Sequence, residues 1–138
     1  MKNIVLKSLT TFVVMSLLNF LFTVWTIGFL HLPGGNFGMF PFLILIFCSI
    51  ISLIGLITVL IFRKSYHSIL RISILFETIY LFLLIISGNN PFLYFSEASN
   101  ESILNLLMYI NSFIVFLIIY LFDLIYSKII ISNLKTGK

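Results

Sequence analysis

Among the residues of this sequence, Glu77 is the strongest candidate for a chemical role. It lies inside an apolar run of residues 67–87 that contains no other acid. A charged acid at the centre of a bilayer costs on the order of 2.5–3.5 kcal/mol, so this residue is expected either to be protonated or to face a polar cavity. It could then exchange a proton or bind a ligand. Alternatively, a protonated Glu77 could hold helices together by hydrogen bonds to Asn19 and Ser52.

Two polar side chains from other apolar runs, Asn19 and Ser52, are predicted to lie at the level of Glu77. Ser73, Glu77 and Tyr80 share one face of a helix at 100° per residue. Counting about 1.5 Å per residue from the basic end of each apolar run places Asn19, Ser52 and Glu77 at a depth of about 14–17 Å. This is the middle of a hydrocarbon core roughly 30 Å thick. The candidate intramembrane polar site therefore consists of Glu77, Asn19, Ser52 and Tyr80.

The other reactive residue types form no recognisable site. His31 and His67 are predicted on opposite sides of the membrane, about 30 Å apart, so they cannot share a metal ion with Cys48. That cysteine is the only one in the chain, which excludes a disulfide framework. Motifs of P-loops, serine hydrolases, zinc proteases and dinucleotide-binding folds are absent. We therefore expect no catalytic residue, no metal and no cofactor, and a protein that is not an enzyme.

The composition predicts the elements that must position these residues. Of the 138 residues, 61% are hydrophobic and 9% are charged, whereas a soluble domain carries about 25% charged residues. Four apolar runs, of about 21 to 24 residues each, are long enough to cross a core that needs roughly 20. They comprise residues 8–30, 40–62, 67–87 and 103–126. Because the connections are short, we predict an all-α integral membrane protein with a single domain, residues 1–138, folded as an antiparallel up-down bundle of four transmembrane helices.

Each apolar run has one face that differs from lipid, and we predict that these faces turn inward. Polar groups favour the bundle interior, and small side chains let neighbouring helices approach closely. The faces consist of Ser8, Ser16, Asn19, Thr23 and Thr26 in the first run; Cys48, Ser52 and Gly55 in the second; Ser73, Glu77, Tyr80 and Ser87 in the third; and Asn105, Tyr109, Ser112, Phe116, Tyr120 and Asp123 in the fourth.

The distribution of charge predicts the orientation in the membrane. All eight Lys and Arg residues fall on one side of the four runs, and the other side carries only Glu97 and Glu101. The positive-inside rule therefore places both termini in the cytoplasm, with the chain in the plasma or inner membrane. The first run exceeds the 7–15 residues of a signal-peptide core, so we expect it to be retained. The basic residues are spread over three sites, and no nucleic-acid partner is predicted.

Two groups of charges are predicted near the cytoplasmic boundary. Arg71 and Asp123 both lie about one turn inside it, and we expect them to form an ion pair. Arg63, Lys64 and His67 form a basic hairpin together with Arg71. This hairpin could bind anionic lipid or an acidic segment of a partner, although its charge also serves orientation.

The outer connections are rich in aromatic residues. Phe37, Phe92, Tyr94 and Phe95 are expected at the level of the lipid headgroups. They are interpreted either as an aromatic belt that anchors the bundle or as an outer contact surface for a partner.

Two functions fit these features. The first is contact with another membrane component, as in an accessory subunit or an immunity-type protein. Its partners would be the lipid bilayer and another membrane protein or a second copy. The alternative is a small oligomeric proton-coupled transporter that uses Glu77. A membrane enzyme acting on lipid has weaker support, because Arg71, Tyr120 and Asp123 match no known catalytic arrangement.

Overall fold

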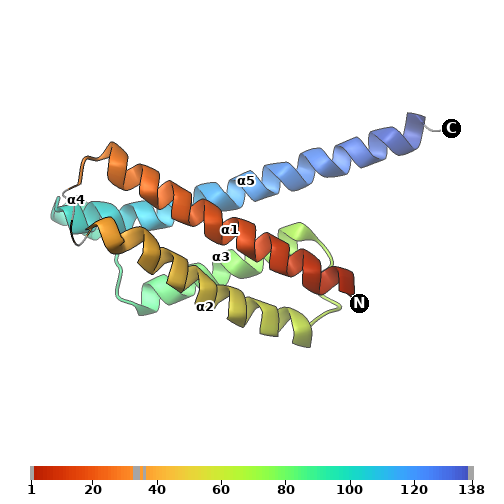
Figure 1. Cartoon of the computed structure of the whole chain (residues 1–138), viewed down its shortest axis with the longest axis horizontal. Coiled ribbons are helices and arrows are strands. Elements are labelled where there is room, and N and C mark those ends of the chain that lie inside the picture. Colours follow the sequence, from red (N-terminus) through yellow and green to blue (C-terminus); the bar gives the residue numbers. More distant parts are fainter. Residues whose placement is uncertain (1, 33–34, 36, 137–138) are drawn as a thin grey trace.

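The computed structural model describes residues 2–32, 35 and 37–136, and within them it is helical without any β-strand. Four long helices, α1, α2, α3 and α5, are joined by connections that contain the single-turn elements η1 and α4 (Figure 1). All four long helices are apolar enough to cross a membrane, which confirms the predicted helical class. The bounds are Lys2–Phe29 for α1, Phe37–Met39 for η1, Phe40–Ile61 for α2, Ile69–Ile86 for α3, Leu93–Ser96 for α4 and Asn100–Thr136 for α5.

Both ends of α3 are defined by local hydrogen bonds. Ser68 is its N-cap residue and accepts a hydrogen bond from the backbone N–H of Arg71 at 3.2 Å. At the other end, Gly88 adopts a φ of 78°, a left-handed conformation that favours glycine. The backbone N–H of Gly88 donates to the carbonyl of Ile85 at 3.1 Å, and the N–H of Asn89 donates to the carbonyl of Leu84 at 3.3 Å. These two bonds form a Schellman motif that stops the helix after 18 residues, or about 27 Å.

The starts of α2 and α5 also follow from their sequences. Pro41 lies in the first turn of α2, where its missing N–H leaves no hydrogen bond unmade. Ahead of α5, Ser99 and Ser102 cap each other: the N–H of Ser102 donates to the Ser99 hydroxyl, and the N–H of Ser99 donates to the Ser102 hydroxyl. Glu101 lies in the first turn, where a negative charge stabilises the helix.

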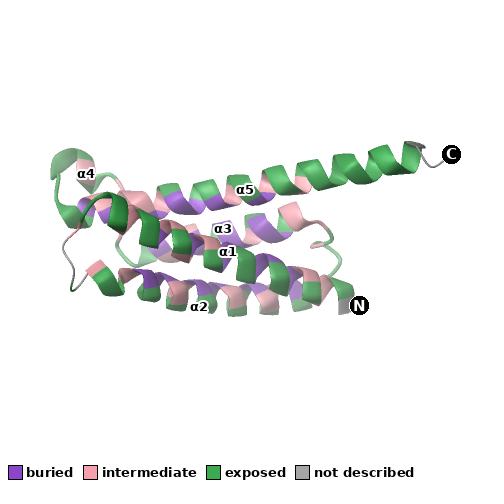
Figure 2. Cartoon of the chain, turned by 45° about the horizontal axis from the view of Figure 1, so that its top comes forward, coloured by how far each residue is buried: buried purple, intermediate pink, exposed green. Residues whose placement is uncertain are grey.

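The helices pack into one bundle in which α1 contacts the other three long helices. Figure 2 shows buried residues on the facing sides of the helices and exposed residues on the outside. Phe12 of α1 is fully buried, and its ring lies 5.8 Å from that of Phe76 on α3. A Cβ added at Gly55 of α2 would lie 2.8 Å from the Phe12 ring. Gly55 therefore permits the close approach that the small residues of this run predict.

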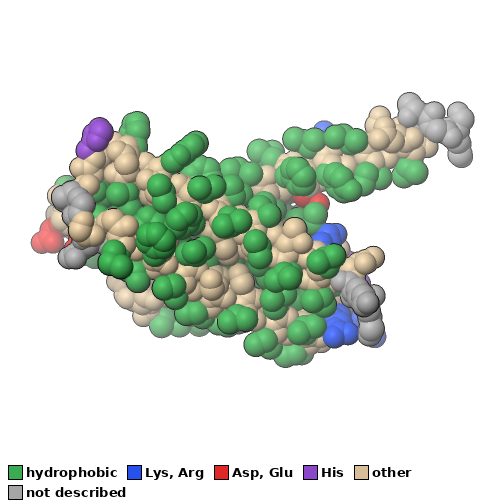
Figure 3. All heavy atoms as spheres, viewed as in Figure 1, with side chains coloured by type: hydrophobic (Ala, Val, Ile, Leu, Met, Phe, Trp, Pro, Cys, Tyr) green, Lys and Arg blue, Asp and Glu red, His purple; other side chains and the backbone are tan. Residues whose placement is uncertain are grey.

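The basic side chains mark one end of the bundle. Lys7 Nζ donates to the carbonyl of His67 at 3.1 Å, which joins the first turns of α1 to the α2–α3 connection. Arg63 and Lys64 lie in the same connection. In Figure 3, Lys and Arg side chains are visible around this end, on the right of the view, and on α5. We call it the basic end, and the end that carries α4 the opposite end.

The helix α5 is longer than the predicted run of 103–126. It continues for 37 residues, about 55 Å, and extends past the rest of the bundle at the basic end (Figures 1 and 2). The helix therefore continues beyond the predicted apolar run, which ends at Tyr126. Polar residues end the apolar run here, but no Pro or Gly occurs between 100 and 136 to end the helix. In residues 121–135, which we call the projecting segment, every residue except Asp123 is exposed.

Candidate functional site

Glu77 lies in the interior of the bundle and links two helices. Its side chain is buried, and its Oε2 accepts a hydrogen bond of 2.6 Å from the hydroxyl of Ser112 on α5. Its other oxygen, Oε1, is buried without a hydrogen-bond partner. A buried oxygen without a partner is costly in an apolar interior.

Asn19 occupies the interior face of α1. It is fully buried, and its Nδ2 donates to the carbonyl of Met15 at 3.0 Å, one turn earlier in the same helix. Its Oδ1, like the Oε1 of Glu77, is buried without a partner. Among the described residues, three buried side-chain oxygens thus lack a hydrogen-bond partner: these two and the Oγ of Ser8. Unsatisfied buried oxygens of this kind occur at proton-handling or ligand sites, or where a water molecule bridges them.

Ser52 connects α2 to α1. Its hydroxyl donates to the carbonyl of Cys48 at 2.8 Å and lies 3.3 Å from the hydroxyl of Ser16 on α1. Its contacts are therefore with α1 and with its own helix, and neither of its two hydrogen bonds goes to Glu77. The buried Cys48 also lies in this part of the interior.

Tyr80 contributes an aromatic wall to the same interior. It is almost completely buried, stacks on Phe76 at a centroid distance of 6.3 Å, and meets the edge of Phe47 at 5.4 Å. The four residues of the candidate polar site thus reach the interior from α1, α2 and α3. No hydrogen bond joins any two of them.

Two hydrogen bonds of the interior were not anticipated from the sequence. Ser112 was expected on the inner face of the fourth run, but not as the partner of Glu77. Asn111, next to it, was not identified at all, and its Nδ2 donates to the Thr26 hydroxyl of α1 at 3.2 Å. Helical periodicity could have located both, since Met108, Asn111, Ser112 and Val115 are buried together.

The structure does not bring Arg71 and Asp123 together. Arg71 is exposed and donates from Nη1 to the carbonyl of Ser65 at 2.9 Å, in the connection before its own helix. Arg71 is on the outer face of α3, because it lies about 160° around the helix from the buried Ser73. Asp123 is half-buried on α5. Among the described side chains, no Lys or Arg forms an ion pair with an acid.

The aromatic residues of the opposite end differ in exposure. Phe92 and Phe95 are exposed, whereas Phe37 and Tyr94 are half-buried. The rings of Tyr94 and Phe95 meet edge to face at 5.8 Å. The expected contact surface therefore consists mainly of two exposed phenylalanines next to α4.

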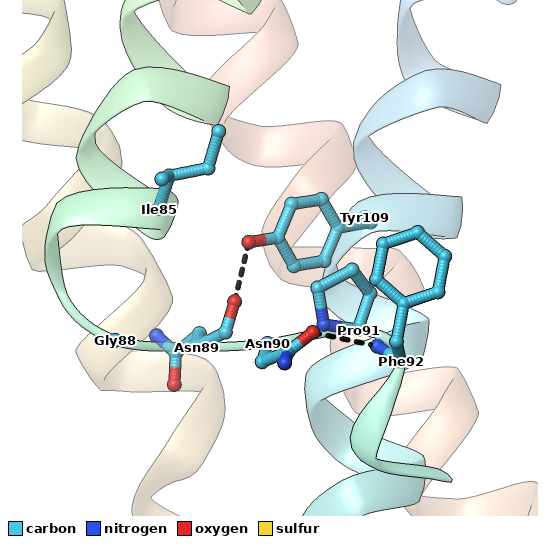
Figure 4. A pocket seen from close by; sticks show the side chains of 7 residues that line it. All are labelled: Ile85, Gly88, Asn89, Asn90, Pro91, Phe92 and Tyr109. Carbon is cyan, nitrogen blue, oxygen red and sulfur yellow. Dashed lines mark hydrogen bonds between the residues drawn. The ribbon is translucent and has the colours of Figure 1, made fainter. Parts of the chain in front are cut away.

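Phe92 also lines a cavity of about 370 Å³ between the end of α3 and α5 (Figure 4). The hydroxyl of Tyr109 on α5 donates to the carbonyl of Asn89, and the Oδ1 of Asn90 accepts from the N–H of Phe92 at 2.9 Å. These bonds fix the turn that follows the Schellman motif of α3. The cavity walls also include Ile85, Gly88 and Pro91.

The polar groups of this arrangement offer proton exchange and hydrogen bonding. Within residues 2–32, 35 and 37–136, no group of three His, Cys, Asp or Glu side chains is placed to hold a metal ion. Ser16, Thr23 and Ser73 are buried, and each donates its hydroxyl to a carbonyl one turn earlier in its own helix. Comparison of the chain with protein-family models, with curated proteins and with solved structures finds no match.

Proposed function

We propose that this chain is a membrane protein that acts by contact with another membrane component, as an accessory subunit or an immunity-type protein, and that it catalyses no reaction. The observation that carries this proposal is the projecting segment of α5. A helix of about 55 Å exceeds a hydrocarbon core of roughly 30 Å. Its last turns therefore extend beyond the thickness that α3 spans.

The apolar residues of these last turns are those that a partner would cover. Ile129, Ile130, Ile131 and Leu134 are 42–71% exposed and lie within six positions of one another. A cluster of large aliphatic side chains beyond the membrane is typical of an interaction surface. The sequence places Lys128 and Lys135 beside them.

The interior of the bundle supports the same proposal. Its polar groups connect α1 to α2, α1 to α5 and α3 to α5, which is the pattern of side chains that hold transmembrane helices together. Of four grooves and cavities in the structure, none is lined by Glu77.

The proposal includes a topology. We expect antiparallel neighbouring helices in the plasma or inner membrane, with the basic end in the cytoplasm. Reporter fusions after Lys138 and near Lys64 should then report the cytoplasm, and fusions near Gly35 and Ser96 the exterior. A C-terminus outside the cell would contradict this arrangement.

Purification from native membranes in a mild detergent tests the function. The wild-type chain should bring down another membrane protein in a fixed ratio. The double variant Ile130→Ser, Leu134→Ser should lose that protein. The control Leu60→Ser, Ile61→Ser removes two exposed aliphatic residues from the end of α2 and should retain it. Equal loss in both variants would contradict a specific role of the projecting segment.

A proton-coupled transporter is the second candidate, and the two unpartnered oxygens of Glu77 and Asn19 favour it. Glu77→Gln preserves the size of the side chain but cannot exchange a proton. If the protein transports a substrate with protons, this variant should remain folded and lose transport. A variant that folds and keeps its activity would show that Glu77 is structural.

A further inference from the structure

A groove lies between α1 and α5 in the half of the bundle near the basic end. Its volume is about 390 Å³, and α3 closes it at Ile69. Val14 and Leu18 form the wall on α1, and Ile118 and Phe122 form the wall on α5. The groove opens on the outer surface of the bundle, so in a membrane it faces lipid chains.

The groove is apolar even where its residues are threonines. Thr10 donates its hydroxyl to the carbonyl of Leu6, and Thr11 donates to the carbonyl of Lys7, both at 2.8 Å. The hydrogen bonds of both hydroxyls are thus satisfied within α1. These side chains therefore offer their methyl groups to an occupant.

A cation lies one helical turn before the groove on α1, toward the basic end. Lys7, Thr11, Val14 and Leu18 follow one another at spacings of four, three and four residues, which places them along one side of α1. Lys7 is half-buried, and its Nζ makes one hydrogen bond, to the carbonyl of His67. An ammonium group has three donors, so it can bind a further acceptor without breaking this contact.

The nearby acid does not neutralise Lys7. Asp123 is the acid closest in sequence to the groove residue Phe122, and it lies about 100° further around α5. Among the described side chains, no Lys or Arg is paired with an acid. Lys7 is therefore a cation without an acidic partner, one helical turn from an apolar groove.

We propose that this groove binds an anionic phospholipid, with an acyl chain against α1 and α5 and the phosphate at Lys7. The apolar walls match the hydrocarbon chain, and the cation matches the headgroup. Basic pockets between transmembrane helices bind anionic lipids in this way. A zwitterionic lipid would bring its own ammonium group next to Lys7 and is disfavoured for that reason.

Native mass spectrometry of the full chain in detergent, with phosphatidylglycerol or phosphatidylcholine added, tests the headgroup contact. Phosphatidylglycerol should bind once per chain and more tightly than phosphatidylcholine. Lys7→Gln should weaken its binding about fivefold, the effect expected of one cation near a membrane surface, and Lys7→Arg should restore it.

Arg71→Gln is the matched control. It removes the same charge and also one hydrogen bond to the α2–α3 connection, but on the outer face of α3. The affinity of this variant for phosphatidylglycerol should stay within twofold of that of the wild type. Equal weakening by the Lys7 and Arg71 substitutions, or equal binding of the two lipids, would overturn the proposal.

A second pair of variants tests the acyl chain. Ile118→Trp fills the groove, whereas Ile57→Trp places the same side chain on the exposed face of α2. Only the Ile118→Trp variant should lose the binding of phosphatidylglycerol. If Ile118→Trp binds lipid normally, or if the groove is instead covered in a dimer of the chain, the assignment of this ligand is wrong.

Discussion

The two halves of α5 differ in packing although they belong to one uninterrupted helix. One half packs against the bundle, and the other is exposed. In the first half, Ser102, Asn111 and Ser112 are buried against the other helices. In the projecting segment, large aliphatic residues such as Ile129 and Ile131 are exposed. Both halves are mostly apolar, but only the first half is packed. Exposed aliphatic clusters like that of the projecting segment are unusual in soluble monomers.

The difference shows which groups determine packing in this protein. Lipid chains solvate an isoleucine as well as a neighbouring helix does, so apolar side chains alone do not drive association in the bilayer. A serine or asparagine has no partner in lipid and gains one between helices, as Ser112 does with Glu77. Polar and small residues therefore mark the interior of the bundle.

The largest expected loss of stability comes from adding a side chain at Gly55. Gly55→Leu would drive a side chain into the ring of Phe12, which is fully buried and packs on Phe76. Overpacking of this kind costs about 1–3 kcal/mol. We expect a lower midpoint of unfolding in a titration with SDS, followed by circular dichroism.

Gly28→Leu is the control for that experiment. No atom lies within 4 Å of a Cβ added at Gly28, which is also helical. Its unfolding midpoint should equal or slightly exceed that of the wild type, because leucine favours helix over glycine. Equal damage by the two substitutions would mean that α1 and α2 do not approach each other at Gly55.

A smaller loss of stability is expected from removing a hydrogen bond in the packed half of α5. Ser112→Ala removes the hydrogen bond to Glu77 and leaves a second buried carboxyl oxygen without a partner. Hydrogen bonds between transmembrane helices contribute about 0.6 kcal/mol on average and up to about 1.7. The same SDS titration should detect this loss.

Ser127→Ala serves as the comparison on the same helix. Ser127 is exposed, and its hydroxyl donates to the carbonyl of Leu124 in the same helix. Its removal should leave the midpoint within about 0.3 kcal/mol of the wild type, as expected for an exposed site. If both serine variants lose the same stability, the two halves of α5 do not differ as described.

The sequence was sufficient to predict the four apolar helices, but only part of their inner faces and none of the partners of the polar groups. Ser87, predicted to face inward, is exposed, and the buried Asn111 was missed. Apolar runs of about 20 residues and polar residues at helical spacing depend on local order along the chain. The partner of Glu77 depends on how α3 and α5 rotate against each other, which no periodicity encodes. The apolar run of residues 103–126 did not show how far α5 continues, because polar residues end an apolar run whereas a helix is ended by breakers such as Pro or Gly.

The predicted pair of Arg71 and Asp123 provides a further test. Because the two side chains are not paired in this structure, Asp123→Asn should change the unfolding midpoint by less than about 0.5 kcal/mol. The charge exchange Arg71→Asp, Asp123→Arg should then bring no recovery relative to either single change. If the exchanged variant recovered stability, the ion pair predicted from the sequence would form after all.

A similarly small effect on stability is expected when apolar residues of the projecting segment are replaced. Ile130 and Leu134 are exposed beyond the packed half of α5, so replacing both by serine removes no packing inside the bundle. The isolated chain in detergent should unfold within about 0.5 kcal/mol of the wild type, and its helix content by circular dichroism should be unchanged. Loss of the co-purifying membrane protein together with unchanged stability would separate the contact function from the fold. A large loss of stability in the isolated chain would mean that the segment folds back onto the bundle, and the contrast between the two halves of α5 would be wrong.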